Sequence, residues 1–342
     1  MDEKIRINKP ICLEHSSLKY PLPEKLLFEL SEELYNMNQY PSGGDYLELS
    51  TKLADYAGVA PGNILPTNGS DEVIESTTRA FGSKLILIPT PTFSQYEASA
   101  DRNGFSKKLV NCLQGYDYKL NYNDDDLKEA SLVWICNPNN PTGESISREI
   151  IKNILDRSAG IVIVDECNYE YLGETVADLI DKYHNLVISR SFSKNFGLAG
   201  FRLGFTIASP KNIIKITRYC QQFRVNRMAE IAGIKVLKYL NYYKEIWQEV
   251  ARVRKQFIAA LHQINIMAFP SKSNFVLVDF ITRENTKSVW QYLRKEGVYT
   301  FAAWEDEFSG LENHYIRFTI GTRQEMDYTL MLLNQYQKNN PI

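Results

Sequence analysis

The sequence of 342 residues has few of the side chains from which disulfide-rich and metal-binding proteins are built. It contains four histidines and five cysteines, and the cysteines are scattered, odd in number and without CxxC spacing. This pattern argues against a disulfide framework and against a zinc site. A histidine-rich metal centre is not expected either.

A charge excess of one sign and long apolar runs are also missing. The 39 lysines and arginines nearly balance the 41 aspartates and glutamates, so no overall basic field would attract nucleic acid or an anionic membrane. No apolar run approaches the roughly 20 residues of a membrane span, and residues 1–10 are charged, without a signal-peptide core. We expect a cytoplasmic protein that binds neither nucleic acid nor membrane, with any phosphate recognition being local.

The sequence contains instead an alternation of apolar runs and amphipathic segments. Apolar runs at 84–88, 132–136, 161–164 and 186–189 predict buried strands, and segments with helical spacing lie between them. Such alternation predicts an α/β fold with a mainly parallel sheet and helices on both faces. Residues 1–23 are punctuated by prolines, and we expect them to wrap over the protein rather than to form core.

The pattern changes in the last third of the chain. Residues 228–262 keep helical periodicity almost throughout, which is too long for one helix of a compact domain without a kink. Strand and helix patterns then alternate from 274 to 338 and predict a small α+β domain. We therefore expect an arm with part of the small domain at 1–36, a large domain at 37–245 and a small C-terminal domain at 246–342.

Polar residues follow the predicted strands, where ligands of open parallel sheets bind. Each group has an ordinary explanation as a turn, a helix cap or solvated surface. Because four elements supply complementary groups to the same place, the groups taken together nevertheless indicate a ligand-binding site. The groups are Asn137–Gly143 after the second strand, Asp165 and Glu166 after the third, Ser191, Ser193 and Lys194 after the fourth, and Gly69 and Ser70 before the first helix of this domain.

Lys194 is the residue around which this candidate site is organised. It lies among small hydroxyl and glycine residues, and Arg202 follows eight positions later. A lysine that forms a Schiff base needs a fixed, partly desolvated setting, with anion-binding groups beside it where the aldehyde carries a phosphate.

Taken together, these motifs resemble the fold-type I, pyridoxal-phosphate-dependent aminotransferases, in particular histidinol-phosphate aminotransferase and its relative threonine-phosphate decarboxylase. The resemblance runs from about Tyr40 to Met326, in the family's order and spacing. The motifs that carry it are Asn68–Glu72, Pro91–Phe93, Asn137–Gly143, Asp165–Glu166, Ser191–Lys194 with Arg202, and Arg317–Thr322.

The resemblance implies a role for each residue around the ring of the cofactor, pyridoxal 5'-phosphate. Lys194 would hold the aldehyde as a Schiff base and carry a proton between the substrate Cα and the cofactor. Asp165 would keep the pyridine nitrogen protonated, which deepens the electron sink. Asn140 would hydrogen-bond the phenolic oxygen, and Phe93 would stack on the ring.

The resemblance also implies how the phosphate and the substrate are held. Backbone N–H groups, hydroxyls and a guanidinium would bind the phosphate; they belong to Gly69, Ser70, Ser191, Ser193 and Arg202. Tyr40 would reach the phosphate from the other subunit, which implies a homodimer with shared sites. Arg317 would grip the substrate carboxylate with a bidentate pair.

Departures from the family pattern bear on the substrate. Asn168 stands where the family usually has a tyrosine, and a shorter amide either still reaches the phenolic oxygen or leaves space for a different substrate. The arm at residues 13–21 lacks the Asn-Glu-Asn-Pro-type segment of relatives. Arg224 is an added positive charge near the expected cleft mouth, with Arg227 close by.

From these departures we infer that the substrate carries a second anion, and we expect this anion to be a phosphate. Arg224 or Arg227 would bind it with help from Lys19 or Tyr20. The alternative is that the two arginines lie at a helix start and face solvent.

The residues leave more than one function open. The first is transamination of a small phosphorylated amino acid or amine in a ping-pong cycle. The second is decarboxylation of a phospho-amino acid, because the same lysine, aspartate and asparagine serve both reactions. The third is a catalytically silent binding protein on the same fold, against which the intact set Lys194, Asp165 and Asn140 weighs.

Overall fold

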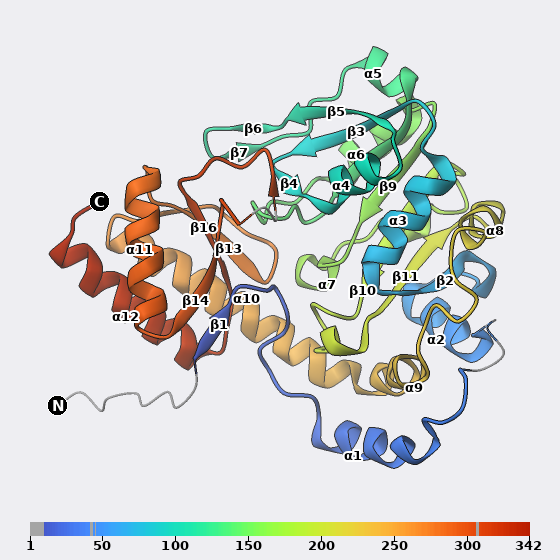
Figure 1. Ribbon diagram of the computed structural model, residues 1–342, viewed down its shortest axis with the longest axis horizontal. Helices are drawn as coiled ribbons and strands as arrows, with labels where there is room; N and C mark the ends of the chain where they lie inside the picture. The colour runs from blue at the N-terminus through green and yellow to red at the C-terminus, as the bar shows by residue number, and fades with distance from the viewer. Residues whose placement is uncertain (1–9, 42–43, 45, 306–307) are drawn as a thin grey trace.

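The computed structural model describes residues 10–41, 44, 46–305 and 308–342. The first nine residues of the predicted arm therefore lie outside the described part. Two sheets lie side by side, each with its own helices (Figure 1). The long helix α10 (Leu240–Gln263) runs from one half of the molecule to the other.

The larger sheet has seven strands in the order β2-β11-β10-β9-β8-β3-β5. Five adjacent strands are parallel to one another, namely β10, β9, β8, β3 and β5. Strand β11 is antiparallel to both β10 and β2. The predicted α/β fold is confirmed as a mixed sheet with a parallel core. The strands are β2 (Ile64–Asn68), β3 (Leu85–Thr90), β5 (Ser106–Asn111), β8 (Ala130–Cys136), β9 (Ile161–Asp165), β10 (Leu186–Ser191) and β11 (Leu203–Ala208).

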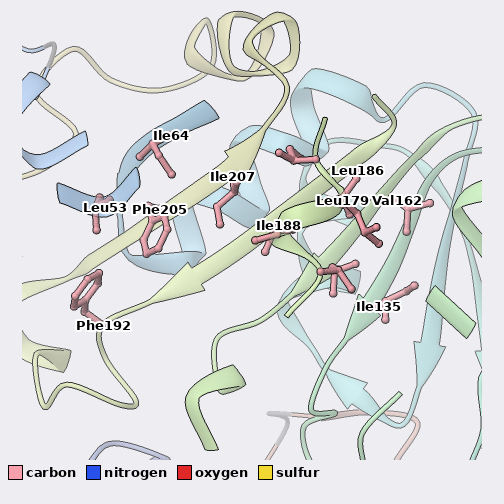
Figure 2. Close-up of a cluster of buried hydrophobic side chains, with 14 of the residues drawn as sticks. Leu53, Ile64, Ile135, Val162, Leu179, Leu186, Ile188, Phe192, Phe205 and Ile207 are labelled. Carbon is pink, nitrogen blue, oxygen red and sulfur yellow. The ribbon is translucent and has the colours of Figure 1, made fainter. Parts of the chain in front are cut away.

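The central strands are apolar along their whole length because helices cover both faces of this sheet. Alternate residues face opposite sides, so Val162 and Val164 join one core cluster while Ile163 joins another. Figure 2 shows the first cluster, in which Phe205 of β11 lies near Leu53. This packing fixes the strand ends where the candidate site lies.

Helices α2, α5, α6 and α9 supply side chains to the first cluster, and α3, α4 and α8 supply them to the other. Side chains of Asn123 and Ser147 cap the N-termini of α5 and α6. The helices are α1 (Glu24–Glu33), α2 (Leu47–Ala57), α3 (Gly69–Phe81), α4 (Gln95–Arg102), α5 (Asp124–Glu129), α6 (Arg148–Arg157), α7 (Tyr169–Leu172), α8 (Pro210–Thr217) and α9 (Arg227–Val236).

The second sheet has five strands in the order β1-β14-β16-β13-β12, and its core cluster includes side chains of α10, α11 and α12. Two further sheets have two short strands each, β4 with β15 and β6 with β7. The remaining elements are β1 (Ile11–Leu13), β4 (Thr92–Phe93), β6 (Leu113–Gln114), β7 (Asp117–Tyr118), α10 (Leu240–Gln263), β12 (Met267–Ala268), β13 (Phe275–Asp279), α11 (Arg283–Lys295), β14 (Val298–Ala302), β15 (Phe308–Ser309), β16 (Tyr315–Thr319) and α12 (Arg323–Asn339).

The expected break in the helical segment 228–262 is confirmed, since a 3-10 turn at Leu237–Tyr239 separates α9 from α10. The expectation that residues 1–23 stay out of the core is wrong for β1, where Ile11 and Leu13 are buried. A three-residue strand is too short to show a periodic pattern, and its partner β14 lies far along the chain. The domain limits at 36/37 and 245/246 stay a prediction.

No helix in the described ranges is long and apolar enough to cross a membrane. The same ranges contain no group of three or more His, Cys, Asp or Glu side chains placed to hold a metal ion.

Candidate active site

A cavity of about 340 Å³ lies at the carboxyl ends of β8, β9 and β10 and brings together most of the predicted residues. The strand ends converge there because the three strands are parallel neighbours. The predicted residues that line it are Ser70, Phe93, Asn140, Asp165, Asn168, Ser191, Ser193, Lys194 and Arg202.

Asp165, the last residue of β9, is held by two donors. Its Oδ2 accepts a hydrogen bond from Tyr96 Oη at 2.6 Å and its Oδ1 accepts one from Cys167 N at 3.0 Å. Tyr96 is itself fixed by stacking on Trp134, with 4.2 Å between ring centroids. Burial raises the pKa of Asp165, although the two donors and the charge of Lys194 act in the opposite direction.

Lys194 lies in the turn after β10, and its backbone is fixed on both sides. Tyr171 Oη donates to Lys194 O at 3.0 Å, and Trp247 Nε1 donates to Asn195 O at 2.8 Å. The aromatic side chains of Phe192 and Phe196 are buried in the core on either side of the lysine. The ammonium group is therefore carried on a backbone with little freedom to move.

The N-terminus of α3 meets Arg202 at another wall of the cavity. Gly69 has φ +72°, and a Cβ there would lie 2.7 Å from Arg202 Nη2, so the backbone approaches the guanidinium more closely than any other residue would allow. Arg202 Nη2 pairs with Asp71 Oδ2 at 2.7 Å. Ser193 N donates to Ser191 Oγ at 3.1 Å. A helix N-terminus, hydroxyl groups and a guanidinium together form an anion-binding set.

Arg317 lies directly behind the cavity wall rather than in it. The side chain is fully buried, and its Nη1 donates to Asn140 Oδ1 at 2.9 Å. Its Nη2 donates to Glu14 O at 2.6 Å, which ties the arm to β16. The predicted contact of Arg317 with a substrate carboxylate stays a prediction.

Asn168 lines the cavity with its side-chain oxygen unsatisfied. The residue is 6% exposed, and its Oδ1 accepts no hydrogen bond within the described part of the chain. Buried polar atoms in folded proteins are nearly always paired. Asn168 is therefore an exception among the described residues that line the cavity, because its oxygen is buried without a partner.

The arm contributes a wall of the cavity through His15, Ser16 and Ser17. Asn274 Nδ2 donates to Ser16 O at 2.6 Å and holds this wall in place. Lys19 is adjacent, and its Nζ donates to Ser17 Oγ at 3.4 Å. Burial lowers the pKa of Lys19.

Tyr20 and Gly69 do not line the cavity, and neither do the two arginines predicted to bind a substrate phosphate. Tyr20 is half-buried and packs against the core of the second sheet. Arg224 Nε donates to Pro66 O at 2.7 Å, and its guanidinium lies 4.9 Å from the ring centroid of Tyr46. The charge that was expected near the cleft mouth is thus partly engaged by the protein's own backbone.

Arg227, which is half-buried, contacts the exposed Tyr40 outside this cavity. Arg227 Nη1 donates to Tyr40 O at 3.3 Å, and Tyr40 stacks on Phe223 with 4.8 Å between centroids. Tyr40 is 76% exposed. The structure therefore leaves this aromatic ring at the surface of the chain that carries it.

Sequence reasoning missed Tyr96 in this site. Tyr96 lies at the start of α4, just after Phe93 of β4, and the two rings meet edge to face with 5.9 Å between their centroids. No pattern in the arm singled out His15, because its position depends on hydrogen bonds from Asn274 and Arg317, more than 250 residues away.

The residues of the cavity fit a cofactor that combines an aldehyde, an aromatic ring and a phosphate. Lys194 is the amine, Asp165 is a buried carboxylate, and Phe93 supplies an aromatic face. Ser70 at the N-terminus of α3, together with Ser191, Ser193 and Arg202, lines the same cavity and supplies donors for a phosphate. These are the groups that pyridoxal 5'-phosphate requires.

Comparison with known proteins gives the same assignment. The family model described as aminotransferase class I and II matches residues 15–332. The chain is 33% identical to histidinol-phosphate aminotransferase of Thermoanaerobacter sp. (strain X514), over 93% of this chain and 90% of that relative.

Solved structures agree in fold. The histidinol-phosphate aminotransferase from Clostridium acetobutylicum superposes with a TM-score of 0.86 at 27% identity, covering 96% of this chain and 99% of that one. The enzyme of that name from Sinorhizobium meliloti, in complex with pyridoxal-5'-phosphate, has a TM-score of 0.81 at 20% identity, covering 97% and 92%. The chain therefore belongs to the class I and II aminotransferase family, and its cofactor is pyridoxal 5'-phosphate.

Proposed function

We propose that this aminotransferase takes its amino group from a small phosphorylated amino acid or amine. The observation that carries the proposal is the single cavity that gathers Lys194, Asp165, Asn140 and Arg202. The name of the Thermoanaerobacter relative supports a phosphorylated donor.

The cofactor supplies an electrophilic carbon and an electron-withdrawing ring. Lys194 Nζ would anchor its aldehyde in the resting enzyme; once the amine of the donor has displaced it, the freed Nζ would act as the base that moves the proton at Cα of the donor. The Asp165 carboxylate holds a proton on the ring nitrogen by charge pairing. Its buried setting strengthens that interaction, because no water competes for the carboxylate.

The remaining residues of the cavity bind and orient. Phe93 covers the ring, Asn140 and Asn168 contact its polar edge, and the α3 N-terminus with Gly69, Ser70, Ser191, Ser193 and Arg202 holds the phosphate. Arg317 binds the donor carboxylate, and its existing hydrogen bond to Asn140 couples that contact to the ring. The wall of His15 to Ser17 excludes water from the donor side.

We further propose that the protein acts as a homodimer in which Tyr40 reaches the partner's phosphate site. The exposed position of Tyr40 supports this, as do the exposed apolar side chains of Phe28, Leu34, Tyr35 and Leu47 in the same stretch. Arg224 lies beside Tyr46, and Arg227 contacts Tyr40. In such a dimer both arginines would therefore lie at the subunit interface together with Tyr40. With Lys19 and Tyr20 they stay the candidates for binding a second anion.

A product assay tests the function. The holoenzyme is incubated with phosphorylated amino donors, with their dephosphorylated forms and with a panel of keto acids. Keto product from the phosphorylated donors is expected, with no carbon dioxide. Release of carbon dioxide without a keto product would instead establish the decarboxylase alternative.

Two variants serve as controls for this assay. Lys194→Ala should abolish turnover and also the absorption band near the visible edge that borohydride removes. Arg224→Gln should reduce turnover of phosphorylated donors more than that of unphosphorylated ones, and equal losses would remove Arg224 from the substrate site. A cytoplasmic location remains our prediction, to be checked by cell fractionation.

A further inference from the structure

A second cavity of about 690 Å³ lies beside α10, and its lining shares no described residue with the active site. It is bounded by α10, by the segment after β12 and by the residues that follow the Asn137–Gly143 run. Its polar side chains are those of Glu144, Ser145, Arg254, Lys255, Ser271 and Lys272.

The cavity carries an unbalanced positive charge. Arg254 is 8% exposed, and neither it nor Lys255 nor Lys272 forms an ion pair with any carboxylate of the described ranges. Arg254 Nη1 donates to Ser273 O, a neutral acceptor. Buried charges in proteins are normally paired, because desolvation without a counter-charge is costly. Burial accordingly lowers the pKa of Arg254 to about 10.

The one acidic side chain of the cavity does not balance these cations. Glu144 accepts a hydrogen bond at its Oε2 from Tyr118 N at 3.3 Å, on the side of β7. Burial raises the pKa of Glu144. The lining thus contains three cations and a single carboxylate that is engaged elsewhere.

We propose that this cavity is a second anion-binding site, which takes a small polyanion bearing phosphate or carboxylate groups. Arg254 supplies a fixed charge at its base, and Lys255 and Lys272 are exposed at its rim, where flexible ammonium groups can close on the ligand. The hydroxyl of Ser145 adds a neutral donor beside them.

The site is linked by a backbone hydrogen bond to the segment that carries Asn140 in the wall of the active site. Lys272 N donates to Gly143 O at 2.7 Å, and Gly143 ends the run that carries Asn140. A Cβ on Gly143 would lie 2.3 Å from Ser271 Oγ, so the two segments are in close contact. An anion held by Lys272 therefore acts on the segment that positions Asn140.

Titration calorimetry of the holoenzyme tests the proposal, with pyrophosphate and citrate as probes. Bound cofactor keeps the phosphate cradle of the active site occupied. Wild-type protein should bind one anion per chain, and Lys255→Gln/Lys272→Gln should bind it at least tenfold more weakly. Binding of both probes indicates a general polyanion site, whereas binding of pyrophosphate alone indicates a phosphate site.

The matched control is Lys238→Gln/Lys244→Gln, which also removes two positive charges. Lys238 lies in the 3-10 turn before α10 and Lys244 lies in α10, and neither lines this cavity. Its affinity should equal that of the wild type. Equal weakening in both double variants, unchanged affinity in Lys255→Gln/Lys272→Gln, or no binding to wild type would each overturn the proposal. Arg254→Lys, which keeps the charge, should retain most of the affinity. The proposal does not depend on the identity of the amino donor.

Discussion

At the scale of single residues, the hydrogen bond from Tyr96 Oη to Asp165 Oδ2 can be removed with little other change to the structure. In Tyr96→Phe the ring can still stack on Trp134, but the carboxylate loses a donor. A hydrogen bond to a charged group contributes about 1.5–3 kcal/mol, so we expect kcat/KM to fall roughly 10- to 100-fold.

The direction of the pKa change distinguishes this role from a structural one. Without the donor, the pKa of Asp165 should rise further, which would shift the acidic limb of the pH–rate profile upward. Tyr118→Phe is the matched control, because the Tyr118 hydroxyl is buried without a hydrogen-bond partner among the described residues. An unshifted pH profile in Tyr96→Phe would contradict the proposed role.

Residues that follow strands were predictable because strand ends converge at one edge of a sheet. Asp165, Ser191 and Lys194 all line the cavity for this reason. Arg224 was expected near the cleft mouth, yet a backbone carbonyl at Pro66 engages its guanidinium. Such a contact depends on side-chain direction and on a strand 158 positions away, and neither is encoded in local spacing.

At the scale of elements, the start of α3 is the part of the site most sensitive to one added atom. In Gly69→Ala the new methyl group would lie 2.7 Å from Arg202 Nη2 at a φ of +72°, so the guanidinium must move and the backbone is strained. We expect cofactor affinity to fall at least tenfold, measured as the dissociation constant in equilibrium dialysis.

Gly200→Ala provides the comparison at a nearby glycine. No atom lies within 4 Å of the position that a Cβ would take there, and its φ is not positive. Its cofactor affinity should match the wild type. If both variants bind the cofactor equally well, the close approach of Gly69 to Arg202 has no part in cofactor binding.

Long elements were predictable because many residues repeat the same signal. Strands β8 to β10 consist of continuous apolar runs, and their predicted positions agree with the structure within two residues. Strands β2 and β11 were not predicted. They lie next to turn-forming sequence at Asn68–Gly69 and at Gly197–Gly204, and only their antiparallel pairing makes them strands.

At the scale of the whole molecule, the exposed apolar residues between positions 27 and 47 predict an association surface. Helices α1 and α2, which flank this stretch, both pack against α9. Leu34→Glu/Tyr35→Glu places two charges on side chains that are 61% and 92% exposed, so folding should survive. We expect a monomer by light scattering and a loss of at least tenfold in activity, because Tyr40 no longer meets a partner.

The control variant replaces another exposed apolar side chain with a charged one. Met331→Glu lies on α12 and is 42% exposed, far from this stretch in the sequence. It should remain dimeric and active. A monomeric double variant with full activity would show that each site is complete within one chain.

The place of β1 in the second sheet also bears on how the protein is made. All seven strands of the large sheet lie between residues 64 and 208, whereas β1 pairs with Val298–Thr300 and the arm is fixed by Asn274 and Arg317. During synthesis the large sheet can form while the C-terminal part is still untranslated. Strand β1 must therefore wait for β14, and the wall of His15 to Ser17 closes only after Asn274 and Arg317 have been synthesised.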